Sequence, residues 1–217
     1  MARLSELVEA LARTLDVEAR TVSVCARHLR EAGLIQQKGR GTSAADMRPK
    51  DATNLLLGIM VSGLLQDAPK NVRIARKATL DRVRGSKPYP YRFLKDDHEN
   101  IGTIGDIVEA LIEEAVRFGD PLTSENLPIT NLSFSVSDHG EKSWFDLDTG
   151  DVQHAFLFKH DDPRLDGLKH IERVKAAKGI FNARRKGLRV VTQIDLHHIH
   201  EIAKILRGVN KRLAGDD

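Results

Sequence analysis

The 217-residue chain has one cysteine, Cys25, and no long apolar run. A single cysteine forms no internal disulfide, and its place inside a helical pattern favours a small packing residue over a nucleophile. The longest apolar stretch, residues 54–65, falls well short of the roughly 20 residues that span a bilayer. The N-terminus also lacks the apolar core and cleavage site of a signal peptide. We therefore expect a cytoplasmic protein without a membrane span.

The sequence also lacks the signatures of common enzyme sites. It contains no phosphate-cradling glycine loop, no nucleophile elbow and no paired-cysteine metal site. His197, His200 and Glu201 have the i, i+3, i+4 spacing of metal ligands on one helix, but the apolar spacing around them also predicts an ordinary amphipathic helix with the histidines in water. We predict no enzyme activity, no cofactor and no bound metal, with a metal-dependent enzyme as an alternative.

Composition places the chain among globular proteins. It is 41% hydrophobic and 30% charged, which is too apolar for disorder, and its length suits two small domains. The net charge of +3 indicates little about partners, but basic residues gather between Lys70 and Lys95, where Asp81 is the one acidic residue. We interpret residues 67–100 as a basic linker.

The first 35 residues have the pattern of two helices joined by a tight corner. Leu4, Leu7, Val8, Leu11, Ala12 and Leu15 recur at helical spacing, and Asp16 suits a left-handed corner. A second helix follows, with Val22, Cys25, Ala26 and Leu29 inward and an end at Gly33. This arrangement leaves a polar, basic face outside the core: Ala19, Arg20, Ser23, Val24, Arg27 and Arg30.

These residues carry a resemblance. The pattern L-A-x-x-L-x-V-x-x-x-T-V-S-x-x-x-R-x-L-x-x-x-G-L-I, over residues 11–35, resembles the winged helix-turn-helix of MarR-like and GntR-like bacterial regulators. The resemblance covers about a fifth of the chain. The segment GRGTSAADMRPKDATNLL also resembles pieces of uncharacterised prophage proteins.

The resemblance implies that residues 18–32 form a recognition helix in the major groove of double-stranded DNA. Arg20, Ser23 and Arg27 would read base edges, with Ala19 and Val24 on the same face. Phosphate contacts would come from Arg13 and Arg30, and from Lys38 and Arg40 at the tip of a wing. The alternative is a two-helix packing unit whose arginines are merely solvated.

The chain departs from the family pattern at one point that matters for assembly. Winged-helix domains have a further helix before the one that starts near Leu4, so another element must cover the apolar stripe. The segment from Pro49 to Gln66 is predicted to be a helix that is apolar nearly all round. We expect it to take the missing helix's place and to bury its spare face against a second copy, giving a homodimer.

The rest of the chain predicts an α+β module. A helix is expected over 103–118, then a three-stranded antiparallel meander over 132–158, a helix over 163–178, a strand over 188–194 and a helix over 196–213. The fold class is thus α+β, with a winged-helix-like domain at 1–66, the linker at 67–100 and a dimerisation, sensor or partner-binding domain at 101–217.

Together these patterns predict a homodimeric, sequence-specific bacterial or phage transcriptional regulator. The competing hypothesis is a protein-interaction adaptor of a mobile element, in which the helix-turn-helix unit is a docking surface.

Overall fold

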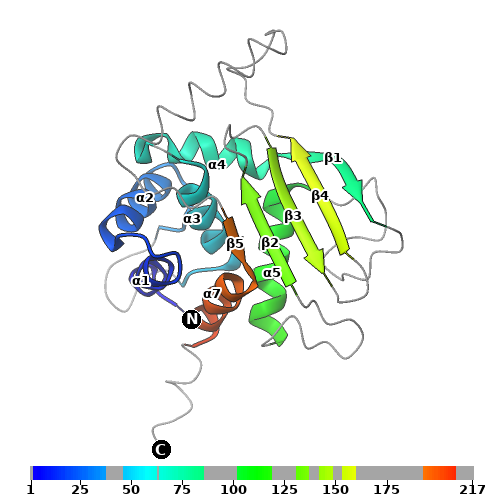
Figure 1. Ribbon diagram of the computed structural model, residues 1–217. Coiled ribbons are helices and arrows are strands. Elements are labelled where there is room, and N and C mark those ends of the chain that lie inside the picture. The colour runs from blue at the N-terminus through cyan, green and yellow to red at the C-terminus, as the bar shows by residue number, and fades with distance from the viewer. Residues whose placement is uncertain are drawn as a thin grey trace, which may run out of the picture.

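The computed structural model describes residues 2–37, 46–62, 64–85, 102–118, 131–136, 142–148, 153–159 and 193–208. The first half is mainly helical and the second half contains most of the strands (Figure 1). The elements in chain order are α1 Leu4–Thr14, α2 Ala19–Glu31, α3 Pro49–Val61, the 3-10 turn η2 Leu65–Asp67, α4 Ala68–Arg76, β1 Thr79–Arg84, α5 Ile104–Phe118, β2 Asn131–Val136, β3 Lys142–Asp148, β4 Gln153–Lys159, β5 Gln193–Asp195 and α7 Leu196–Gly208.

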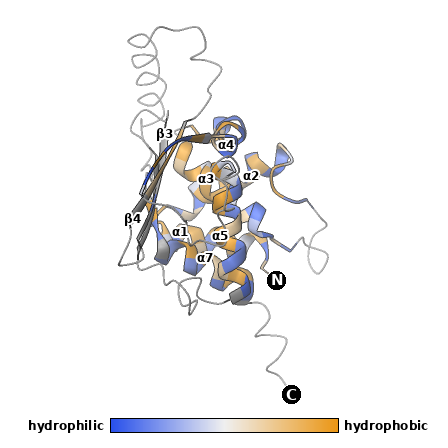
Figure 2. Ribbon diagram, turned by 90° about the vertical axis from the view of Figure 1, so that its right-hand side faces the viewer, coloured by the Kyte–Doolittle hydropathy of each residue, from blue (hydrophilic) through white to orange (hydrophobic). Residues whose placement is uncertain are grey.

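The fold is α+β, as predicted. Its five strands form one sheet in the order β1-β4-β3-β2-β5, and every neighbouring pair is antiparallel. The labelled helices lie together on one side of this sheet (Figure 2). None of the helices within the described ranges is long and apolar enough to cross a membrane.

The predicted meander is confirmed. β2 pairs with β3 from Asn131 opposite Asp148 to Val136 opposite Ser143, and β3 pairs with β4 in the same manner. Phe156 and Phe158 alternate with less buried residues along β4, so one face of this strand joins the core. The predicted helix over 163–178 lies outside the described residues.

The basic segment 67–100 is not the linker that the sequence predicted. Its first half forms α4 and β1, and β1 adds to the edge of the sheet next to β4, with a bulge between Leu80 and Arg82. Val72 and Ala75 are buried, which explains the helix: Lys70 and Arg73 lie on its exposed outer face, whereas Arg76 is half-buried. Residues 86–101 lie outside the described part of the chain.

Helix α3 is the central element of the helical layer. All of its residues from Asp51 to Val61 are buried, and it packs on α2, α4 and α5. A Cβ on Gly58 would lie 2.8 Å from the Sγ atom of Cys25, so α3 approaches α2 at a distance that only glycine permits. The expectation that α3 has a spare face for a second copy is therefore wrong, because the chain itself buries that face.

The C-terminal helix covers the first helix. α1 packs on α2 and on α7, and α7 also packs on α5. The element that completes the N-terminal unit is thus α7, almost 200 residues away in the chain, while α3 supports α2. The buried apolar side chains of the N- and C-terminal segments form one continuous core.

Candidate nucleic-acid interface

The corner between α1 and α2 is built by three residues. Asp16 has φ +52°, the left-handed conformation that the sequence predicted. The amide of Val17 donates a 2.9 Å hydrogen bond to the carbonyl oxygen of Ala12, and the Val17 side chain is 9% exposed. The corner is therefore fixed by a backbone bond and by an apolar side chain that fills the angle between the helices.

Helix α2 divides cleanly into an inner and an outer face. Val22, Cys25, Ala26 and Leu29 are buried as predicted. Around the outside, the predicted contact residues Ala19, Arg20, Ser23, Arg27 and Arg30 are exposed. Val24 differs from the prediction, because it is half-buried instead of fully exposed.

The end of α2 is held by side chains from two other helices. Gly33 has φ +72° and turns the chain out of the helix, and Nη2 of Arg73 donates a 3.0 Å hydrogen bond to the carbonyl oxygen of Ala32. One residue later, Nδ2 of Asn54 donates to the carbonyl oxygen of Leu34 at 2.6 Å. Such bonds satisfy carbonyl groups that a helix end leaves without partners.

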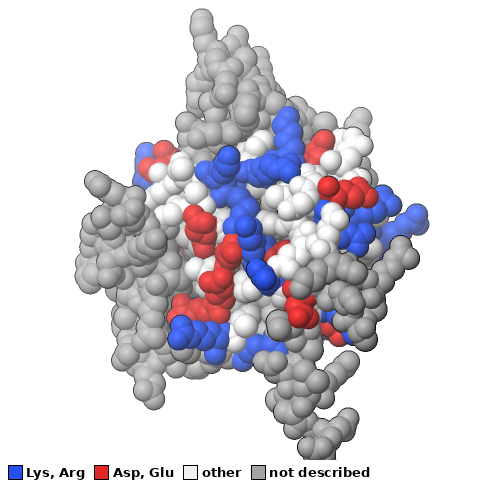
Figure 3. Space-filling model, turned by 180° about the vertical axis from the view of Figure 1, so that it is seen from behind, with Lys and Arg blue, Asp and Glu red and all other residues white. Residues whose placement is uncertain are grey.

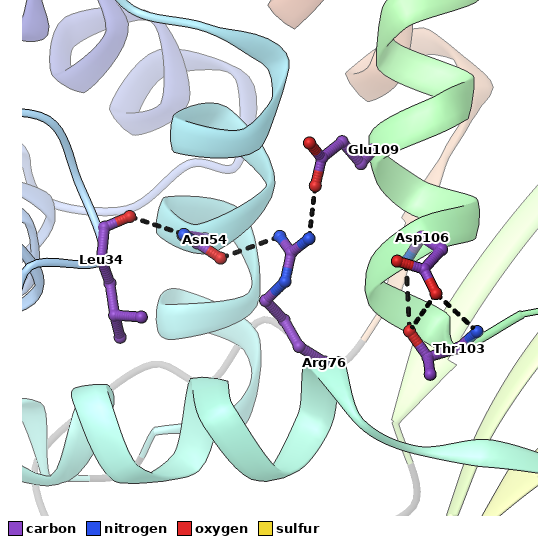
Figure 4. A network of polar contacts seen from close by, with 6 residues as sticks. All are labelled: Leu34, Asn54, Arg76, Thr103, Asp106 and Glu109. Atoms are coloured by element: carbon purple, nitrogen blue, oxygen red, sulfur yellow. Dashed lines mark hydrogen bonds and ion pairs between the residues drawn. The ribbon is translucent and has the colours of Figure 1, made fainter.

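Asn54 belongs to a polar network that runs from the end of α2 to α5. Its Oδ1 accepts a 2.9 Å hydrogen bond from Nη1 of Arg76, and Nη2 of Arg76 forms an ion pair with Glu109 (Figure 4). The Asn54 side chain is fully buried, and the side chains of Arg76 and Glu109 are 18% and 22% exposed. The network therefore connects α2, α3, α4 and α5 through directional contacts.

A groove of about 650 Å³ runs between the first half of α1 and the outer face of α2. Its lining is mixed: apolar side chains are contributed by both helices, and the charged residues are three arginines of α2 and one glutamate of α1. The lining residues are Leu4, Ser5, Val8, Glu9, Ala19, Arg20, Ser23, Val24, Ala26, Arg27 and Arg30.

The arginines of this groove are poorly neutralised. The Arg27 Nε and Glu31 Oε1 atoms lie 3.9 Å apart with both side chains more than half exposed, so this pair contributes little. Arg20 and Arg30 have no ion-pair partner within the part of the chain that the structure describes. Seen from behind, the helical side of the molecule carries acidic and basic side chains beside one another (Figure 3).

No family model, curated protein or solved structure matches this chain. The interpretation of the candidate site therefore rests on the geometry of its residues.

Of the three remaining predicted contact residues, the structure describes one. Arg13 is exposed on α1, whereas Lys38 and Arg40 lie outside the described residues. The ends of their segment are held together: the buried carboxylate of Asp51 accepts hydrogen bonds from the amide of Gln36 at 3.0 Å and from the amide of Arg48 at 2.9 Å. Gln36 and Arg48 are thus held close together by one side chain of α3.

Sequence reasoning missed the contribution of α1 to this groove. Ser5 and Glu9 were assigned no role, yet both line the groove, and Leu4 and Val8 also line it in addition to the core packing that the sequence predicted for them. Leu4 with Val8, and Ser5 with Glu9, have i, i+4 spacing, which places each pair on one face of the helix. This spacing is the sequence signal that could have indicated their shared position.

Two other sets of side chains could take part in chemistry: the Cys25 thiol, and the cluster of His197, His200 and Glu201. Burial raises the pKa of the Cys25 thiol to about 12, which removes the thiolate that a nucleophile needs and agrees with a packing role. His197 is exposed, and His200 and Glu201 are half-buried. No three metal-ligating side chains among the described residues are arranged to hold a metal ion.

The start of α7 is capped by Asp195 and His198. The Oδ1 atom of Asp195 lies 2.6 Å from Nδ1 of His198 and accepts a 3.3 Å hydrogen bond from the His198 amide. Burial raises the pKa of Asp195, but the hydrogen bonds and charge of His198, with the backbone amide of His197, outweigh it, so the pKa is lowered overall.

This cap predicts a pH-dependent contribution to stability. A lowered folded-state pKa stabilises the fold above the unfolded pKa of about 3.9, and this contribution is lost as the pH falls through the lower folded value. We expect Asp195→Ala to lower the free energy of unfolding by about 1 kcal/mol at pH 6, the usual effect of losing an N-cap. The difference should shrink towards pH 2.

Denaturant unfolding at the two pH values measures this difference. Asp46→Ala is the matched control, because Asp46 is an exposed carboxylate without a hydrogen-bond or ion-pair partner in the described ranges. A deficit for Asp195→Ala that is equal at both pH values would refute the assignment.

Proposed function

We propose that the protein binds double-stranded DNA through the outer face of α2, with a winged-helix-like N-terminal unit. The observation that carries the proposal is the combination of a supported inner face and a basic outer face whose arginines are poorly neutralised. α2 is packed by α1 and α3 and held at its end by Arg73, while Arg20, Ser23 and Arg27 remain exposed. A fixed helix that presents arginines and a short hydroxyl suits the major groove.

We assign base contacts and phosphate contacts to residues according to their positions on the two helices. Arg20, Ser23 and Arg27 read base edges, and Arg13 and Arg30 contact phosphates. Lys38 and Arg40 belong to the proposed wing, which is supported by the way Asp51 ties Gln36 to Arg48. In this proposal the protein is a cytoplasmic transcriptional regulator of bacterial or phage origin.

The protein acts as a homodimer in this proposal. Two-fold symmetry of the protein matches two half-sites about one helical turn apart on the duplex. Because α3 is buried within the chain, the dimer uses another surface.

Salt-dependent binding to duplex DNA tests the proposal. Fluorescence anisotropy with a 20-base-pair duplex should show log K falling linearly with log salt concentration, and Arg30→Ala should reduce the slope by about 0.9 for its one lost phosphate contact. Lys204→Ala is the control, since Lys204 is an exposed cation of α7 that pairs with Glu201. An unchanged slope for Arg30→Ala would place the duplex elsewhere.

The adaptor function remains the second candidate, and one observation favours it. The groove contains apolar side chains of Leu4, Val8 and Val24, which a helix of another protein would bury. Absence of duplex binding at low salt together with a stable protein partner would establish this function instead.

A further inference from the structure

On the basic side of the groove, one apolar residue of α2 lies between two arginines. Arg20, Val24 and Arg27 follow one another at i, i+4, i+7 along α2, so they share one stripe of the helix surface. The two arginines are exposed, but Val24 between them is half-buried. It lines the same groove as Leu4 and Val8 of α1, so it has apolar neighbours across the groove.

This arrangement is selective for one feature of the DNA major groove. Arginine donates two hydrogen bonds to O6 and N7 of guanine, whereas a valine neither donates nor accepts. The C5 methyl of thymine is the apolar group that a base edge presents there. A cytosine amino group or a purine N7 placed against Val24 would lose its hydrogen bond to water without replacement.

The spacing along the helix fits a short run of base pairs. Seven residues separate Arg20 from Arg27, which corresponds to about 10 Å along the helix axis. Stacked base pairs are about 3.4 Å apart, so one or two of them lie between the guanines that these arginines reach.

We propose that Val24 reads the C5 methyl of a thymine that lies between two guanines contacted by Arg20 and Arg27. The proposal rests on the proposed DNA-binding function and adds a base identity to it. Val24 is then a specificity-determining residue, and Leu4 and Val8 complete the apolar pocket around the methyl group.

Replacing thymine by deoxyuridine tests the proposal, because this change removes the methyl group and nothing else from the duplex. In a duplex selected from a random library by the full chain, each thymine is replaced in turn. One thymine per half-site, flanked by guanines, should show an affinity loss of about fourfold, the value for one buried methyl group.

The protein side of the test uses three variants. Val24→Ala should bind the thymine and deoxyuridine duplexes within twofold of each other, and Val24→Thr, which keeps one methyl group, should still prefer thymine. Ser5→Ala, on the α1 side of the same groove, is the matched control and should retain the full fourfold preference. Circular dichroism of each variant checks that its helical content is the same as in the wild type.

The outcomes separate this proposal from the one on which it rests. If the selected duplex tolerates deoxyuridine at every position, the methyl contact of Val24 is refuted and the DNA-binding proposal is unaffected. The same holds if Val24→Ala keeps the preference for thymine over deoxyuridine. Failure to select any duplex overturns both. Loss of the thymine preference in Ser5→Ala would overturn the assignment of the methyl contact to Val24.

Discussion

A fragment comprising residues 1–66 is expected not to fold on its own. α1 packs on α7, and α3 is buried partly against α4 and α5, none of which the fragment contains. The fragment would expose the part of α3 that packs on α4 and α5, and the residues of α3 from Asp51 to Val61 are all buried in the whole chain. Burying one apolar side chain contributes about 1.5–3 kcal/mol, so exposing even a few of them approaches the total stability of a small domain.

Thermal unfolding followed by circular dichroism measures this expectation. The full chain should show a cooperative transition and the 1–66 fragment should show none. A second chain, ending at residue 192, removes β5 and α7 alone; hydrogen exchange should then be accelerated in α1 more than in α4. Cooperative unfolding of the 1–66 fragment would mean that it is an autonomous domain.

Replacing Asn54 by leucine is expected to destabilise the protein by about 3 kcal/mol. The change leaves the Leu34 carbonyl and Nη1 of Arg76 without their partner, and each buried polar group without a hydrogen bond costs about 1–3 kcal/mol. Leucine has the same number and branching of side-chain heavy atoms as asparagine, so we expect the lost hydrogen bonds to make the largest contribution. Denaturant unfolding gives the change in free energy.

A double-mutant cycle isolates the network. Arg76→Met removes the other polar partner, so Asn54→Leu combined with Arg76→Met should cost less than the sum of the single changes by at least about 1 kcal/mol. Asn54→Asp is the conservative control: it keeps an acceptor for Arg76 but loses the donor to Leu34. Additive single changes would show that Asn54 and Arg76 do not interact in solution.

Local signals in the sequence predicted the helix-turn-helix geometry. The apolar spacing of α1 and α2 identified their inner faces, and the residue types at Asp16 and Gly33 indicated the left-handed positions at the corner and at the end of α2. The alternation of apolar residues predicted the meander. These features depend on neighbours within a few residues, which is why a single sequence reveals them.

Long-range pairing was not predictable in the same way. An apolar stripe on α1 requires a partner, but nothing in its spacing indicates that the partner is α7. The Arg76 network joins side chains or carbonyls from four segments, and each residue alone is an ordinary polar residue. The segment of α4 and β1 was predicted to be a linker because its basic residues outnumber the few apolar ones. The apolar pattern of Val72 and Ala75, which are buried, is too short to indicate a helix by itself.

The residues that α2 contributes to the candidate site were predicted from the sequence, but the α1 residues and the shape of the groove were not. The exposed residues of α2 follow from helical spacing, whereas the groove requires the angle at which α1 crosses α2. That angle determines that Val24 is half-buried and that Glu9 faces the same groove as the arginines.

Selection of bound duplexes from a random library at moderate salt tests the central proposal most directly, with wild-type protein and Arg20→Ala in parallel. We predict an enriched palindrome with half-sites about one helical turn apart for the wild type, and a loss of about 1–3 kcal/mol with relaxed base preference for Arg20→Ala. No enrichment by the wild type, or the same motif and affinity for Arg20→Ala, would contradict the assignment of α2 as the DNA-reading helix.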